Sequence, residues 1–131
     1  NKTSAIMKEL IEEALRVSCL LWNADIEKVR NNSSRLKNNV KAKRMFVYYI
    51  YNILEVSHVD VKNYIIGFNH SSSIYHVKQF NNDLDNDPNV YKIFKKFMHK
   101  MDLYSVYGNG YKEKRKEIEK LKQELIDFIN K

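Results

Sequence analysis

The chain has 131 residues, with 23 Lys and Arg against 16 Asp and Glu, one Cys, one Pro and three Gly. This length suits one domain of ordinary size, and the 44% content of hydrophobic residues excludes a disordered chain. So few Gly and Pro argue against a β-sandwich or barrel, which needs many tight turns. We therefore expect an all-α fold, a helical bundle of about six helices.

The cellular location follows from the cysteine count and the apolar runs. Cys19 has no second cysteine to pair with, which favours a reducing, cytoplasmic location. The longest apolar stretch, residues 45–54, is too short to span a bilayer, so no membrane partner is expected. The first residues lack the pattern of a signal peptide, and a start at Asn1 suggests an excised domain or a processed chain.

The net charge of +7 is concentrated in one window of the sequence. Residues 28–44 carry seven basic groups and no acidic one, and the rest of the chain balances to zero. Such a window is typical of a surface that contacts a polyanion. The alternative is an exposed loop that its charge keeps soluble.

The first half of the chain predicts three helices. Ser4 can cap a helix over residues 4–22, whose apolar stripe is Ile6, Leu10, Ala14, Val17 and Leu21. Asn23 and Asp25 then break the chain before a short helix through Val29, and residues 31–39 read as an exposed loop. A helix over about 40–54 is apolar on most sides, so we expect it at the centre of the bundle.

Residues 57–82 have the spacing of a helix-turn-helix. Ser57 can cap a short helix that ends at Gly67, and a second helix follows, with Ile74, Val77 and Phe80 on its inward face. Short helix, glycine turn and second helix are the parts of this DNA-binding motif.

Two helices complete the chain. Asp87-Pro88 is a strong helix start, and the glycines of residues 108–110 end that region. The last helix has heptad-like spacing over about two heptads, in Ile118, Leu121, Leu125 and Phe128. We expect it to dock onto the domain, and the alternative is a surface over residues 112–130 that pairs with a second copy or with a protein partner. The predicted division is a DNA-binding domain over 1–107 and an amphipathic helix over 108–131.

The sequence offers no enzymatic or cofactor signature. Glycines only at positions 67, 108 and 110 exclude a P-loop and a dinucleotide-binding loop. The four His and Cys19 contain neither a His pair at i, i+4 nor a C-x-x-C, so no metal is expected. The acidic run of Asp83, Asp85 and Asp87 lacks the Gly and Glu of a calcium loop, and we interpret it as a capping loop.

The polar cluster at the start of the second helix is the candidate site. It consists of Asn69, His70, Ser71 and Ser72. In a helix-turn-helix this end faces the major groove, and these side chains are short enough to reach base edges. The alternative is an ordinary helix cap with a surface histidine.

Residues from about 8 to 101 resemble the C-terminal DNA-binding domain of the bacterial replication initiator DnaA, a Trp-repressor-like fold. The family signature is close to G-G-R-D-H-[ST]-[ST]-V-x-H-A, which here reads Gly67-Phe68-Asn69-His70-Ser71-Ser72-Ser73-Ile74. Residues 41–61 look like the family helix that opens with Arg-Gln, with Lys43-Arg44 in that place. Residues 23–30 look like the short helix before the family's basic loop.

The resemblance implies double-stranded DNA as the partner, with Asn69, His70, Ser71 and Ser72 at bases and phosphates of the major groove. It implies that an arginine of the basic loop enters the minor groove, where narrow A·T tracts attract a cation. Arg35 is our choice, but the loop is longer than the family's by about four residues, so Arg30 or Lys37 could serve instead. Lys43 and Arg44 would contact phosphate.

The chain departs from the family at the signature itself. Ile66 and Phe68 replace one of the signature's two glycines and its Arg, and Asn69 replaces Asp. An amide can pair with adenine where a carboxylate accepts from cytosine, so we expect a preferred site other than the initiator's. The family's ATPase module is missing as well. The resemblance thus implies a stand-alone, nucleoid-associated protein with a replication or regulatory role, and a phage or mobile element is its expected source. The alternative is an interaction module that kept the fold without base reading, which Phe68 supports most.

Overall fold

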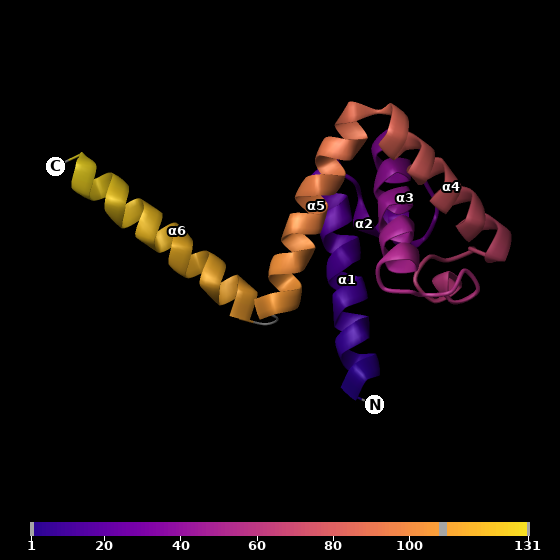
Figure 1. Ribbon diagram of the computed structural model, residues 1–131, viewed down its shortest axis with the longest axis horizontal. Helices are drawn as coiled ribbons and strands as arrows, with labels where there is room; N and C mark the ends of the chain where they lie inside the picture. Colours follow the sequence, from indigo (N-terminus) through magenta and orange to yellow (C-terminus); the bar gives the residue numbers. More distant parts are fainter. Residues whose placement is uncertain (1, 108–109, 131) are drawn as a thin grey trace.

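A computed structural model describes the backbone of residues 2–107 and 110–130, and the side chains of residues 5–104 and 116–130. Over these residues the chain forms six α-helices and no strand, which confirms the predicted all-α fold (Figure 1). The elements are α1 (Lys2–Trp22), α2 (Ile26–Arg30), α3 (Lys37–Asn52), the 3₁₀ helix η1 (Asp60–Asn63), α4 (His70–Asn86), α5 (Pro88–Tyr107) and α6 (Gly110–Ile129).

The N-terminal helices follow the prediction except at the first cap. Helix α1 begins at Lys2, so Ser4 lies inside it and is not its cap. The helix ends where Asn23 adopts a left-handed backbone, with φ of 52°. Asp25 then caps α2, because its Oδ1 accepts from the backbone N–H groups of Glu27 and Lys28 at 3.0 and 3.2 Å.

Helix α3 is the central helix, as its apolar circumference predicts. It packs against α1, α2 and α4. It begins at Lys37, inside the segment that was expected to be a loop, because the side chain of Asn39 is buried against its neighbours. The Asn39 Oδ1 accepts from the backbone N–H of Asp25 at 2.9 Å, and its Nδ2 donates to Ser34 Oγ at 2.9 Å. The exposed loop is therefore shorter than predicted and spans residues 31–36.

An aromatic core holds α3, α4 and α5 together. Phe46, Phe80 and Phe97 are fully buried, one from each helix. The Tyr48 ring lies 5.0 Å from that of Phe80 and 5.5 Å from that of Phe94. Burial of each such phenylalanine contributes about 2–3 kcal/mol to stability. This core fixes α4 on the outer side of α3, where one of its faces stays in solvent (Figure 1).

The predicted first helix of the helix-turn-helix is reduced to one turn. Residues 58–66 form only the 3₁₀ helix η1, with Val61 N–H bonded to the carbonyl of Ser57 at 3.2 Å. Four β-branched residues in this stretch lower its helix propensity, so two buried anchors, Val61 and Ile65, hold it by packing instead. Gly67 makes the predicted turn with φ of 80°.

The acidic run does not form a loop of its own. Helix α4 continues through Asp83 and Asp85 to Asn86, four residues beyond the expected end. Only Asp87 acts as a cap, since its Oδ1 accepts from the backbone N–H of Asn89 at 3.0 Å at the start of α5. The interpretation of all three aspartates as a capping loop was therefore wrong for Asp83 and Asp85.

Helix α6 leaves the bundle after α5 and points away from it (Figure 1). Its side chains over residues 116–130 are all exposed, including Phe128 at 73%. The expectation that this helix docks onto the domain was wrong for those residues, because the bundle formed by α1–α5 already covers its own core. Of the predicted turn at 108–110, Gly108 and Asn109 lie outside the described residues.

Candidate nucleic-acid interface

Asn69 is the N-cap of α4. Its Oδ1 accepts from the backbone N–H of Ser72 at 2.8 Å and from Ser72 Oγ at 3.0 Å. The cap therefore occupies the oxygen that a bidentate contact with adenine would need. The Asn69 Nδ2 has no hydrogen bond among the described residues, so it can still donate to a ligand.

The next residues of α4 divide between solvent and core. His70 and Ser71 are exposed, Ser72 is half-buried, and Ser73 is fully buried. The Ser73 Oγ lies 2.6 Å from Nδ1 of His58, and the His58 ring stacks on Tyr51 at 3.8 Å. Burial and the neighbouring His70 lower the pKa of His58 below its usual value. This contact fixes the start of α4 to α3, and His70 and Ser71 remain available to a ligand.

Phe68 explains how the basic loop comes to lie beside α4. Phe68 is buried and stacks on the His76 ring at 5.1 Å, with Lys43 Nζ 5.9 Å from its centre. Lys43 in turn donates to Asn32 Oδ1 of the loop at 2.8 Å. The loop is therefore linked through the buried Lys43 to Phe68, the residue after the glycine turn, and Phe68 in turn contacts His76 of α4.

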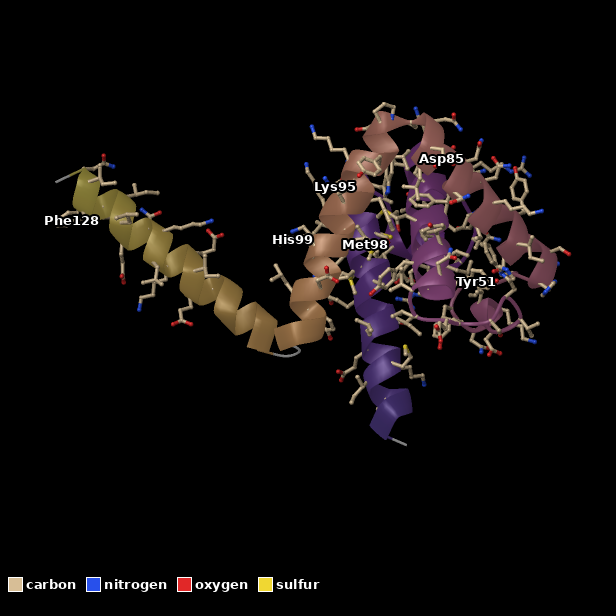
Figure 2. The ribbon with its side chains drawn as sticks, in the orientation of Figure 1. Tyr51, Asp85, Lys95, Met98, His99 and Phe128 are labelled. Atoms are coloured by element: carbon tan, nitrogen blue, oxygen red, sulfur yellow. The ribbon has the colours of Figure 1, made fainter. Side chains whose placement is uncertain are left out.

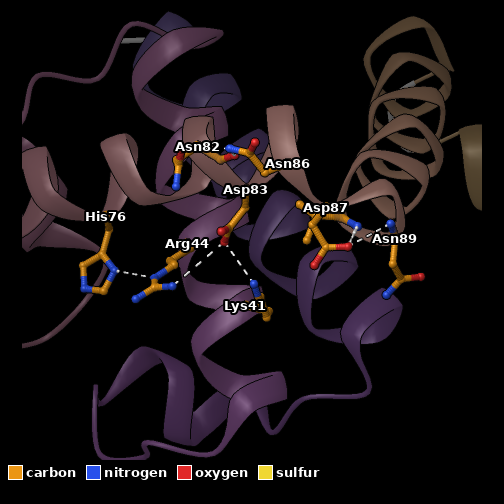
Figure 3. A network of polar contacts seen from close by, with 9 residues as sticks. Lys41, Arg44, His76, Asn82, Asp83, Asn86, Asp87 and Asn89 are labelled. Atoms are coloured by element: carbon orange, nitrogen blue, oxygen red, sulfur yellow. Dashed lines mark hydrogen bonds and ion pairs between the residues drawn. The ribbon is translucent and has the colours of Figure 1, made fainter.

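A chain of polar contacts joins α3 to α4 (Figure 3). Arg44 Nε donates to Nδ1 of His76 at 3.3 Å, and its NH1 lies 4.0 Å from the carboxylate of Asp83. Lys41 Nζ reaches the same carboxylate at 3.0 Å. Burial, then the charges of Lys43 and Arg44, lower the pKa of His76 to about 4, so the ring is neutral at pH 7.

The seven cations of the basic window occupy different surroundings. Lys43 is buried, and burial lowers its pKa. Arg30 donates from its two terminal nitrogens, Nη1 and Nη2, to the two carboxylate oxygens of Glu12, at 3.0 and 2.9 Å. By contrast, Arg35 and Lys37 are exposed and form no ion pair within the described residues. Together with Lys28, which is also exposed and without an ion pair among the described residues, these side chains have the greatest freedom to contact an anion.

Two residues on the exposed face of α4 were not predicted from the sequence as site residues. Tyr75 is 52% exposed and Lys78 is exposed, and together with Ser71 they follow the i, i+4, i+7 spacing of one helix face. Arg44 lies beneath the Tyr75 ring, at 5.9 Å from its centre. These residues lie on the side of the helix opposite the predicted inward face of Ile74, Val77 and Phe80. That prediction could therefore have identified them as outward-facing.

Other features point to no second site. A shallow hollow of about 610 Å³ beside α1 is lined by three glutamates and by two cations, Lys8 and Arg16. Within the described part of the chain, no three His, Cys, Asp or Glu side chains gather closely enough to hold a metal ion.

Burial raises the pKa of Cys19 to about 11, so its thiol is unreactive. Among the described helices, none combines the length and apolar content needed to span a bilayer.

No protein-family model matches the sequence, and no curated protein is detectably similar to it.

Proposed function

We propose that the protein binds double-stranded DNA with sequence preference, with α4 in the major groove. The observation that carries this proposal is the chain of contacts through Asn32, Lys43 and Phe68 that joins the basic loop to α4, whose first residues are exposed. A helix N-terminus also favours phosphate, because its free backbone N–H groups point outward.

The base contacts are assigned to the exposed face of α4. His70 and Ser71 are the direct readers, and Tyr75 offers an aromatic edge to a thymine methyl group. Ser72 contacts the adjoining phosphate. Asn69 keeps its role as cap and contributes one donor, from Nδ2, in place of a bidentate contact with adenine.

The backbone contacts are assigned to exposed cations and to Arg44, which keeps N–H donors beyond the one that it gives to His76. Arg35 reaches the minor groove and Lys37 contacts phosphate, because both are exposed. Arg44 and Lys78 contact phosphate beside α4. Lys43 is too deeply buried for that role and positions the loop, while Arg30 would first have to leave Glu12.

The biological role follows the resemblance rather than the geometry. We propose a replication-initiation-like or regulatory role without ATPase activity, since the chain lacks a P-loop, and no catalytic function. Action at the nucleoid, and an origin in a phage or mobile element, belong to the same proposal.

The second candidate is a protein-interaction module that does not read bases. The exposed apolar face of α6 favours it. In the sequence, Phe68 was the residue that most supported an interaction module. It no longer supports this candidate, because its ring is buried between Lys43 and His76.

Paired variants separate the two candidates in an electrophoretic or anisotropy assay. DNA binding predicts that Arg35→Ala and His70→Ala weaken binding to duplex, while Leu121→Asp leaves the affinity of one domain for one site intact. The interaction module predicts no duplex binding at low salt, and loss of a partner contact in Leu121→Asp and Leu125→Asp. Circular dichroism of each variant confirms that the fold is retained.

A further inference from the structure

Helix α6 presents an apolar surface that its own chain does not cover. Its six large apolar side chains between 118 and 129 are each at least 49% exposed, namely Ile118, Leu121, Leu125, Ile126, Phe128 and Ile129. A single helix of this length is marginally stable in water without packing on its apolar side. The surface therefore needs a partner.

The spacing of these side chains is that of a coiled-coil seam. Ile118 and Leu125 occupy a positions of a heptad, and Leu121 and Phe128 occupy d positions. Ile129 widens the seam at its C-terminal end, where Phe128 and Ile129 are 73% and 70% exposed. Ile126 lies outside the seam, in a b position. Helix α6 extends far enough from the bundle for the whole seam to be approached by another helix (Figure 2).

The flanking charges select a second copy of the same helix, running parallel. In this heptad Glu117 and Glu124 are at g positions, and Lys122 is at an e position. Parallel pairing places each Glu117 opposite the Lys122 of the other copy, since g faces the next e of the partner. Antiparallel pairing places g opposite g and e opposite e, which sets glutamate against glutamate and cation against cation.

We propose that the protein self-associates through α6 as a parallel two-stranded coiled coil. Its seam is short, about two heptads, so the dimer is in concentration-dependent exchange with the monomer. If the proposed DNA binding also holds, the parallel pair carries two α4 helices on one dimer, able to contact two half-sites. The self-association itself does not rest on DNA binding.

Sedimentation equilibrium of the full chain without DNA tests the association. The wild type should approach twice the monomer mass as its concentration rises from micromolar to millimolar. Leu125→Asp should stay monomeric, while Ile126→Asp, its neighbour outside the seam with similar exposure, should dimerise like the wild type. A wild type that stays monomeric at every concentration would overturn the proposal. So would an equal loss of dimer in Leu125→Asp and Ile126→Asp.

Disulfide capture tests the orientation of the two helices. In a Cys19→Ser background, Phe128→Cys should form a cross-linked dimer under mild oxidation, because parallel d positions face each other. Ile126→Cys is the matched control and should cross-link much more slowly. Efficient cross-linking only in a mixture of Ile118→Cys and Phe128→Cys chains would show an antiparallel pair and overturn the parallel assignment.

Discussion

Arg44 donates from Nε to Nδ1 of His76 at 3.3 Å, a contact that requires the ring to be neutral. This pair fixes the outer helix α4 to the central helix α3 at the level of the exposed Tyr75. Lys43 and Arg44 both face the ring, and its folded pKa of about 4 reflects their charge as well as burial. The stability of the proposed interface is therefore coupled to pH.

Acid should destabilise the protein through His76. The unfolded ring has a pKa near 6.5 and the folded ring one of about 4, so the unfolded state binds more protons between these values. The stabilisation is complete above about pH 6.5 and is lost as pH falls toward 4, and each pKa unit corresponds to about 1.4 kcal/mol. Urea unfolding at pH 7 and pH 5 should show a smaller loss in His76→Gln, which accepts from Arg44 but does not titrate. An identical loss in the two proteins would contradict this account.

Restoring the family's arginine at position 68 should damage the fold. Phe68 is 5% exposed beside Lys43, so Phe68→Arg would bury a second cation there, at a cost of about 3 kcal/mol or more. Phe68→Leu, which keeps an apolar group, should cost about 1–2 kcal/mol. Thermal unfolding followed by circular dichroism measures both. An arginine variant as stable as the leucine variant would mean that position 68 opens to solvent.

The two roles assigned to Asn69 can be separated by substitution. Asn69→Ala removes the cap of α4 and should cost about 1 kcal/mol of stability. Asn69→Asp keeps an acceptor for the Ser72 N–H and should be as stable as the wild type, while it removes the Nδ2 donor and adds a negative charge near the DNA. We expect the aspartate variant to bind duplex more weakly at unchanged stability. Equal affinity for duplex would remove Asn69 from the interface.

The sequence predicted the elements whose signals are local, and missed those that depend on distant partners. Apolar periodicity located α1 and α3, and Asp87-Pro88 located the start of α5. The length of η1 could not be predicted from the sequence, because the segment has weak helix propensity and is held by the packing of Val61 and Ile65.

The same reason limited the prediction of the site. The positions of Asn69 as the N-cap and of His70 to Ser72 in the first turn of α4 followed from their place after Gly67. The pairing of Arg30 with Glu12, eighteen residues earlier, and the burial of Lys43 under the turn have no local signature. A window of seven basic residues therefore overstated the number of cations free to contact DNA.

The free cations should control the salt dependence of binding. Arg35→Ala and Lys37→Ala should each lower the slope of log affinity against log salt by about one, because each removes one cation that lies against the DNA. Lys95→Ala is the control, because Lys95 lies on α5 away from α4 (Figure 2). Its slope should equal that of the wild type. A similar reduction in all three variants would indicate that only net charge matters.

Fluorescence-anisotropy titration at several salt concentrations, against a random duplex pool and an A·T-rich duplex, tests the central claim most directly. The account predicts affinity that falls steeply with salt, weaker binding by both Arg35→Ala and His70→Ala, and loss of preference between duplexes in His70→Ala alone. A wild type that binds neither duplex at low salt would contradict DNA binding, and the α4 surface would then have to be explained by a protein partner.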